Sequence, residues 1–238
     1  MSTSQTLIAA LKFQGGVIIA ADTQASDIVA QVRWPCEKLD CIGTYPCVIG
    51  FSGGLGRGQR ARAAIEGTPL HQNMFERKER IRNAWDRCLK PIYKEIREES
   101  VKGAPFYLTQ GLWGLAVYWA EDEAHILEYP INGDSEFCPD FRVIGSAANT
   151  AHAIYQTLGG NRLTVLDERF ALPAMLRILS TSIKVEQQYV SEPLRAWTVS
   201  NKGAKKISED EIETHKETVY RWLERERSVL FGPTTPTS

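Results

Sequence analysis

The chain has 238 residues, enough for one domain with a sizeable core, and its apolar (43%) and charged (24%) fractions are ordinary for a globular protein. Its formal net charge is -1, so no global charge excess indicates nucleic acid or an anionic membrane as a partner. No apolar run reaches the roughly 18 residues required to span a bilayer, and residues 1–5 lack the basic and apolar segments of a secretory signal.

The cysteines and histidines give no pattern typical of a metal site or a disulfide framework. The five cysteines are an odd number without a C-x-x-C pair, and the four histidines are scattered along the chain. Free thiols in a reducing compartment explain this usage best. We therefore expect a cytoplasmic protein without a metal or another cofactor.

The first third of the chain predicts β-strands. Apolar runs at 6–13 and 17–22 flank Gln14-Gly15-Gly16, a pattern typical of a β-hairpin. The runs are nearly continuous rather than alternating, which indicates strands buried on both faces. A second pair of strands is predicted at 36–42 and 47–52, ending at two consecutive glycines.

Helical periodicity follows at 55–65 and again at 73–99, where apolar residues recur three or four positions apart opposite a charged face. Pro91 lies inside the second segment and is expected to kink or divide that helix. The remaining strands are predicted at 112–120, 125–129, 141–144 and 194–200. The remaining helices are predicted at 147–158, 172–184 and 208–227.

The order of these elements predicts an α+β fold. Two antiparallel sheets stacked face to face, with helices on both outer sides, would bury every apolar strand in a four-layer αββα sandwich. Ser208 and Glu211 form a capping box at the start of the last helix. We expect a single domain over 6–230 and a disordered tail at 231–238.

Three stretches of sequence resemble one family. The opening stretch TLIAALKFQGGVIIAADTQAS is similar to the start of proteasome β subunits and of the bacterial HslV peptidase, whose mature chains begin with Thr. Thr6, Asp22 and Lys38 match the Thr, Asp and Lys of that pattern without a gap. The stretches VIGFSGG (48–54) and VIGSAA (143–148) extend the resemblance over about 6–200.

The resemblance implies an N-terminal nucleophile hydrolase: a threonine endopeptidase in which removal of a propeptide, residues 1–5, exposes Thr6 as nucleophile. A Thr hydroxyl needs an adjacent base, and a free α-amine, titrating at about 7.7–8.0, can serve. Lys38, held by Asp22 in a buried ion pair, would keep that amine neutral. The Gly53 N–H matches the oxyanion donor, and Ser146 matches the hydroxyl that orients the amine.

The resemblance also implies a substrate pocket beside Thr6. Ala25, Cys36, Phe51 and Leu55 match positions that line the first specificity pocket of the family. These residues are small or apolar, so we expect cleavage after apolar or aromatic residues. The resemblance also implies three kinds of partner: identical subunits in a stacked double ring, unfolded protein substrates and an ATPase unfoldase.

The chain departs from the family pattern at three places. Gln5 precedes Thr6, where proteasome β subunits usually carry Gly, which most easily adopts the strained turn needed for self-cleavage. Gln24 stands where many proteasome subunits have Arg and HslV-like peptidases have Gln. In the segment 183–191, Ser191 matches a Ser that supports the terminal amine, but the accompanying Asp has no counterpart.

Other interpretations stay open. Taken singly, Thr6 is an ordinary strand residue, Asp22 a turn residue and Lys38 an exposed lysine; the joint spacing favours the site. The chain could instead be a non-catalytic ring subunit, which Gln5 favours, or an amidase acting on a small molecule. A nucleic-acid-binding helix at 76–97 is disfavoured, because acidic residues interrupt its basic ones.

Overall fold

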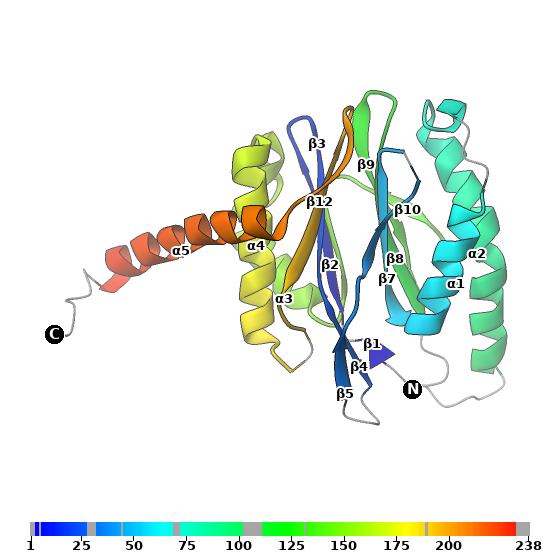
Figure 1. Cartoon of the computed structure of the whole chain (residues 1–238), viewed down its shortest axis with the longest axis horizontal. Helices are drawn as coiled ribbons and strands as arrows, with labels where there is room; N and C mark the ends of the chain where they lie inside the picture. Colours follow the sequence, from blue (N-terminus) through cyan, green and yellow to red (C-terminus); the bar gives the residue numbers. More distant parts are fainter. Residues whose placement is uncertain are drawn as a thin grey trace.

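The computed structural model describes residues 3–4, 6–27, 32–43, 45–68, 72–101, 111–130, 132–188 and 190–231. The described chain is a mixed α+β fold whose strands pair antiparallel throughout, as the sequence predicts (Figure 1). The two larger sheets pack against each other, with helices on the outer side of each.

The first sheet is built around a central strand that ends at the two consecutive glycines. One edge of this strand, β7, pairs with β8, while its other edge pairs with two short strands at different points along its length. The strands of this sheet are β1 (Thr3–Ser4), β6 (Leu39–Cys41), β7 (Cys47–Gly54), β8 (Leu112–Ala120), β9 (Glu123–Tyr129) and β10 (Glu136–Cys138).

The second sheet contains the predicted hairpin. Ile8 pairs with Ala21 and Phe13 with Gly16, and the turn passes through Gly15 at a φ of 95°, which a glycine adopts without strain. The strands lie in the order β11 (Phe141–Gly145), β2 (Leu7–Phe13), β3 (Gly16–Asp22), β12 (Leu194–Ser200) and β13 (Gly203–Lys206). A separate two-stranded ribbon, β4 (Gln24–Asp27) with β5 (Val32–Pro35), continues from the end of β3.

Three apolar clusters hold these elements together. One lies between the sheets and includes Ile19 of β3 and Val117 of β8. A second lies between the first sheet and helices α1 (Leu55–Glu66) and α2 (Lys78–Val101). The third lies between the second sheet and the helices α3 (Ala148–Thr157), α4 (Glu168–Val185) and α5 (Glu209–Phe231), together with the short 3-10 turn at Gly160–Val165.

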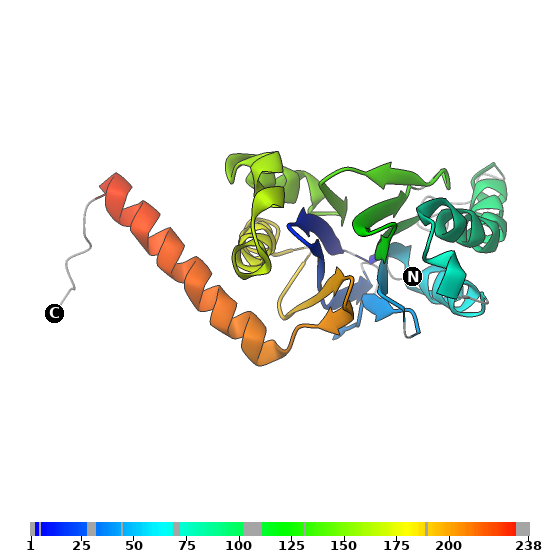
Figure 2. The same cartoon turned by 90° about the horizontal axis from the view of Figure 1, so that it is seen from above.

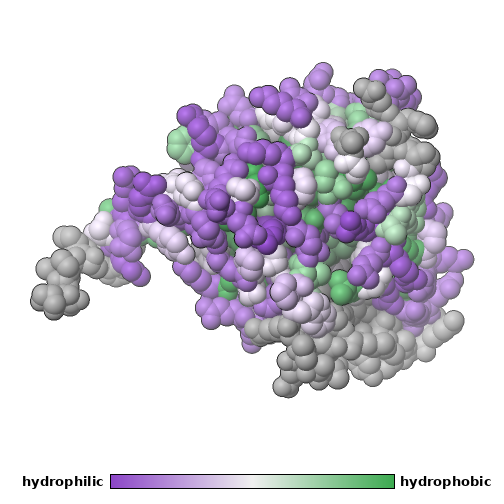
Figure 3. Space-filling model, viewed as in Figure 1, coloured by the Kyte–Doolittle hydropathy of each residue, from purple (hydrophilic) through white to green (hydrophobic). Residues whose placement is uncertain are grey.

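Helix α5 packs against α4 as far as Glu226, which pairs with Arg177, and its C-terminal end projects away from the rest of the molecule (Figure 2). The predicted cap is present, since the hydroxyl of Ser208 accepts from the Glu211 N–H at 3.2 Å. The surface seen in the view of Figure 1 is mainly hydrophilic, including most of this projecting helix (Figure 3). In the described part of the chain, no helix has both the length and the apolarity to cross a membrane.

The structure corrects two of the predicted helices. Pro91 does not divide α2, which runs as one helix because its apolar face, including Trp85 and Tyr93, is buried against the first sheet. The predicted helix start at 73 is a separate 3-10 turn at Gln72–Met74. Helix α4 begins earlier, at Glu168, where the side chain of Asp167 caps it.

The predicted strand at 36–42 is also shorter than expected, because only β6 pairs with β7. The three residues before it belong to no strand. This irregular stretch carries Cys36 and Lys38 toward the start of β2. The predicted tail at 231–238 lies outside the described residues apart from the end of α5.

We predict that Ile19→Ala destabilises the protein by about 2–5 kcal/mol, because Ile19 is completely buried between the sheets and its truncation leaves a cavity there. Chemical denaturation measures this loss. Val229→Ala is the control: its side chain is 84% exposed on α5, and its effect should stay within about 0.5 kcal/mol. Equal effects of the two substitutions would contradict the assignment of Ile19 to the core between the sheets.

Candidate active site

Thr6 lies immediately before β2 and is buried beside the end of β11. The antiparallel pairing of Gly145 with Leu7 places Ser146 directly against Thr6. The Thr6 N–H donates to the Ser146 hydroxyl oxygen at 3.3 Å, and that hydroxyl in turn lies 3.4 Å from the Thr6 carbonyl oxygen. The side chain of Ser146 therefore contacts the main-chain nitrogen that would become an amine if the chain were cut before Thr6.

Gly145 permits this close approach. Its φ is 104°, and a Cβ at this position would lie 1.9 Å from the carbonyl oxygen of Thr6. No other residue fits there without moving one of the two strands. The glycine thus fixes the distance between β11 and the residue at the start of β2.

Asp22 and Lys38 form a buried ion pair next to this point. The Lys38 Nζ lies 2.7 Å from Oδ1 of Asp22. The same carboxylate accepts from the Leu7 N–H at 2.8 Å and from the Gln24 N–H at 3.2 Å. Burial raises the pKa of Asp22 and lowers the pKa of Lys38, and each partner opposes the shift of the other. The ionised state of each side chain therefore depends on the presence of the other.

Gly53, near the end of β7, is held in a conformation that only glycine accepts. Its φ is 118°, and a Cβ would lie 2.0 Å from the Gly111 carbonyl oxygen. Helix α1 begins at Leu55 with no acidic side chain in its first turn and no side-chain cap at Gly54. The positive end of the helix dipole therefore lies at this edge of the sheet, where it favours negative charge.

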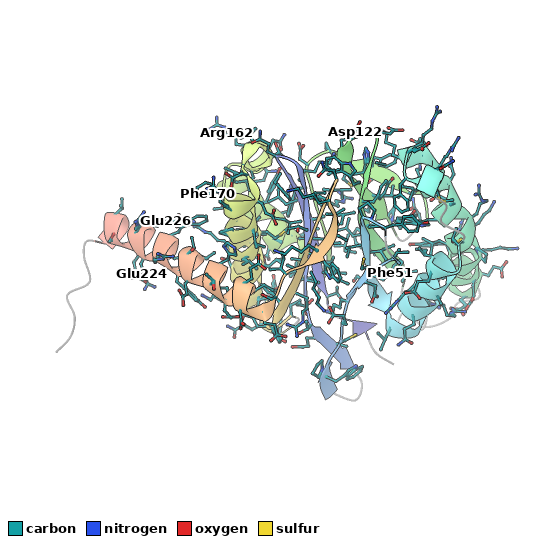
Figure 4. The ribbon with its side chains drawn as sticks, turned by 45° about the horizontal axis from the view of Figure 1, so that its top comes forward. Phe51, Asp122, Arg162, Phe170, Glu224 and Glu226 are labelled. Carbon is teal, nitrogen blue, oxygen red and sulfur yellow. The ribbon has the colours of Figure 1, made fainter. Side chains whose placement is uncertain are left out.

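A cavity of about 120 Å³ opens beside Thr6, Lys38 and Gly53. An engineered cavity of roughly 150 Å³ binds a benzene molecule, so this one is large enough for part of a single side chain. The predicted pocket residues all line this cavity: Ala25, Cys36, Phe51 and Leu55. Figure 4 shows Phe51 near the junction of β7 with α1. Burial raises the pKa of the Cys36 thiol, which favours its neutral form in the pocket wall.

The structure thus brings the nine residues selected from the sequence to one region, although two do not line the cavity. Asp22 contacts Lys38, and Ser146 contacts the Thr6 nitrogen. Ser191, matched to a hydroxyl that supports the amine, lines a different hollow with Thr23 and Gln24.

The charged part of the cavity was not predicted from the sequence. Asp40 and Arg62 line it with Glu37 and Gln59, and Nη1 of Arg62 lies 2.6 Å from Oδ1 of Asp40. A signal for this was present, because Leu55, Gln59 and Arg62 follow helical spacing and so share one face of α1.

Another group of potential ligands lies away from this site. Ligand atoms of Glu128, Glu136 and Cys138 lie within 4.8 Å of one another. Arg142 forms ion pairs with both carboxylates, and Trp113 donates to Glu128, so these groups are already engaged with protein donors. The thiols of all five cysteines are free. The absence of a metal or cofactor remains a prediction.

Comparisons with known proteins identify the fold. No family model and no curated protein matches the chain. Solved structures do match: a mutant of Anbu from Hyphomicrobium sp. strain MC1 has a TM-score of 0.72 at 16% identity, over 94% of this chain and 96% of that one. A protein described as "Anbu (ancestral beta-subunit)" from Yersinia bercovieri has a TM-score of 0.72 at 12% identity, over 98% and 100%.

These matches correct the family resemblance. The structural neighbours are Anbu proteins, which are proteasome-like but a distinct family, so the assignment of this chain to the proteasome β-subunit and HslV type was wrong. Short sequence motifs around a glycine turn and a strand end do not distinguish families that have the same fold. At these identities, the likeness shows the fold alone.

We predict that Lys38→Met destabilises the protein by about 3–5 kcal/mol at pH 7, because it leaves the Asp22 carboxylate buried without its cation. Because burial raises the pKa of Asp22, the Asp22 carboxylate of this variant binds a proton more tightly in the folded state than in the unfolded state. Stability of the variant should therefore rise as the pH falls from 7 toward 4.

Denaturation at several pH values measures both effects. Lys202→Met, at an exposed turn, is the matched control and should change stability by less than about 0.5 kcal/mol. The double variant Asp22→Leu/Lys38→Met should be more stable than Lys38→Met alone, because no unpaired charge is left inside. A single variant as stable as the control would show that the ion pair contributes nothing.

Proposed function

We propose that this protein is a threonine peptidase subunit in which Thr6, once it is the first residue of the chain, is the nucleophile. The observation that carries the proposal is the buried Lys38–Asp22 pair, which shares its carboxylate with the N–H of the residue next to Thr6. A buried ion pair is a poor source of stability, so its position at a threonine beside a cavity favours a chemical role. The two-sheet body would then be the four-layer αββα sandwich of an N-terminal nucleophile hydrolase.

In this proposal the α-amine of Thr6 accepts the proton of its own hydroxyl, and Oγ attacks the carbonyl carbon of the peptide substrate. The Lys38 ammonium favours the neutral amine and the developing alkoxide, and the Ser146 hydroxyl orients the amine. The carbonyl oxygen becomes an oxyanion that accepts from the Gly53 N–H, a contact worth about 2.7–4 kcal/mol. The amine returns the proton to the leaving nitrogen, and water then hydrolyses the ester on Thr6.

Two residues of the proposed propeptide, residues 1–5, here called the leader, support this assignment. Thr3 and Ser4 form β1, which pairs antiparallel with Gly54 and Gly53 at the end of β7 and also contacts β4. An extended backbone therefore lies along the edge of β7 beside the proposed oxyanion donor. We propose that a substrate peptide uses the same edge after residues 1–5 have been removed.

Removal of the leader requires the same nucleophile. The Thr6 hydroxyl attacks the carbonyl carbon of Gln5, the acyl group moves from nitrogen to oxygen, and water cleaves the ester. Residues 1–5 then leave as a peptide ending in a carboxylate, and Thr6 keeps a free amine. Gln5 is compatible with this chemistry, although glycine would reach the strained turn more easily.

We further propose that the subunit assembles with identical copies and acts on unfolded polypeptides in the cytoplasm. The description of one structural neighbour as an ancestral β subunit favours a subunit of an assembly. Enclosing the site in stacked rings would keep it from folded proteins, and an ATPase unfoldase would then supply the substrates. A ring subunit without peptidase activity is the second candidate, and the Gln5–Thr6 junction is the observation that favours it.

We predict that the purified protein loses residues 1–5 and that Thr6→Ala retains them, because the substitution removes the attacking hydroxyl. The measurement is the intact mass of each protein. Thr3→Ala is the matched control: it changes another leader threonine and should still be cut before Thr6. If the unchanged protein keeps Ser2–Gln5, Thr6 has no free amine and the non-catalytic subunit becomes the better interpretation. Loss of the leader in Thr6→Ala would rule out self-cleavage.

A further inference from the structure

The cavity beside Thr6 is lined by both apolar and charged residues. Ala25, Phe51 and Leu55 form its apolar wall. Asp40 and Arg62 also line the cavity, and the Asp40 side chain is 19% exposed. A side chain that enters this cavity therefore meets both carbon and charged groups.

The charges of the described residues around Asp40 do not cancel. Arg62 lies between two carboxylates, with Nη1 2.6 Å from Asp40 and Nε 2.9 Å from Glu66. The single guanidinium of Arg62 therefore pairs with two carboxylates, and the triad of Asp40, Arg62 and Glu66 carries a net charge of -1.

Among the side chains that the structure describes, the other charged groups near the cavity lie close to opposite charges. Lys38 is paired with Asp22. Glu37 lies 3.4 Å from Lys206 and 3.8 Å from Arg195, and Arg195 also pairs with Glu209 at 2.7 Å, which makes two acids and two bases. The excess negative charge is thus located at Asp40 and its neighbours on α1.

We propose that this cavity selects lysine and arginine at the substrate residue whose carbonyl is attacked, and that Asp40 is the residue that determines this preference. The inference rests on the peptidase function proposed above and replaces the apolar preference expected from Ala25, Cys36, Phe51 and Leu55 with a preference for basic residues. The aliphatic stem of a lysine or arginine packs along the apolar wall, and its charged head reaches Asp40.

The order of preference follows from what each side chain does to Asp40. Burial raises the pKa of Asp40 although Arg62 opposes this shift, so removal from water disfavours the negative charge of Asp40. A cationic head supplies the missing stabilisation through a charge-assisted hydrogen bond. A leucine or phenylalanine covers the carboxylate without replacing its water, and a glutamate adds a second negative charge. We therefore expect basic residues to be preferred over apolar ones and acidic residues to be rejected.

The test compares fluorogenic peptides that differ only in the residue before the cleaved bond, which is Arg, Lys, Leu, Phe or Glu. The quantity measured is the ratio of kcat/KM for the Arg peptide to that for the Leu peptide. Asp40→Asn should lower this ratio roughly 10- to 100-fold, since a hydrogen bond to a charged group is lost. Arg62→Gln should raise it, because the substitution removes the cation that neutralises Asp40. Glu98→Gln, an exposed acid on α2, is the control and should leave it unchanged.

The opposite signs of the two substitutions separate specificity from general damage, and intact mass first shows that each protein begins at Thr6. If Asp40→Asn does not fold, Arg62→Gln still carries the test. An equal ratio in the unchanged protein and in Arg62→Gln, or a preference for Glu, would overturn the assignment of Asp40 while leaving the peptidase intact. If the protein beginning at Thr6 cleaves none of the peptides, the proposed function itself fails, and the pocket assignment fails with it.

Discussion

The buried ion pair between Lys38 and Asp22 is the interaction on which the geometry around Thr6 depends. Two charges removed from water are tolerated only when they contact each other and further donors satisfy the carboxylate. Here one of those donors is the N–H of Leu7, so the carboxylate at the end of β3 also holds the residue that follows Thr6. The pair therefore joins the hairpin of the second sheet to the irregular stretch that leads into β6 of the first.

The pair can form because the two sheets bring their ends together at one place. Gly145 lets β11 approach the carbonyl of Thr6, and Gly53 lets β7 pass close to Gly111 on the neighbouring chain segment. A side chain at either position would push the backbone away by more than an ångström. The two glycines thus allow close backbone approaches at Thr6 and at the end of β7, while the apolar cluster between the sheets keeps the two layers in register.

Much of this could be predicted from the sequence, because the informative signals are local. The hairpin of β2 and β3 is specified by two apolar runs and a turn that needs a glycine at positive φ. The continuity of α2 could not be read from Pro91, because the burial of Trp85 and Tyr93 against a distant sheet outweighs a lost hydrogen bond. The ribbon of β4 and β5 was missed since such short strands depend on their neighbours more than on their own pattern.

The charged wall of the cavity was missed for a different reason: its residues come from two elements that meet only in three dimensions, Asp40 from β6 and Arg62 from α1. Their position also bears on the ion pair. A cationic side chain entering the cavity would be repelled by a lone ammonium at Lys38, and the repulsion would be strong in a partly buried site. Because Asp22 neutralises Lys38, the field that such a side chain meets is set by Asp40 and its neighbours. The pairing that prepares Thr6 for chemistry is thus also the condition under which a basic residue can bind beside it.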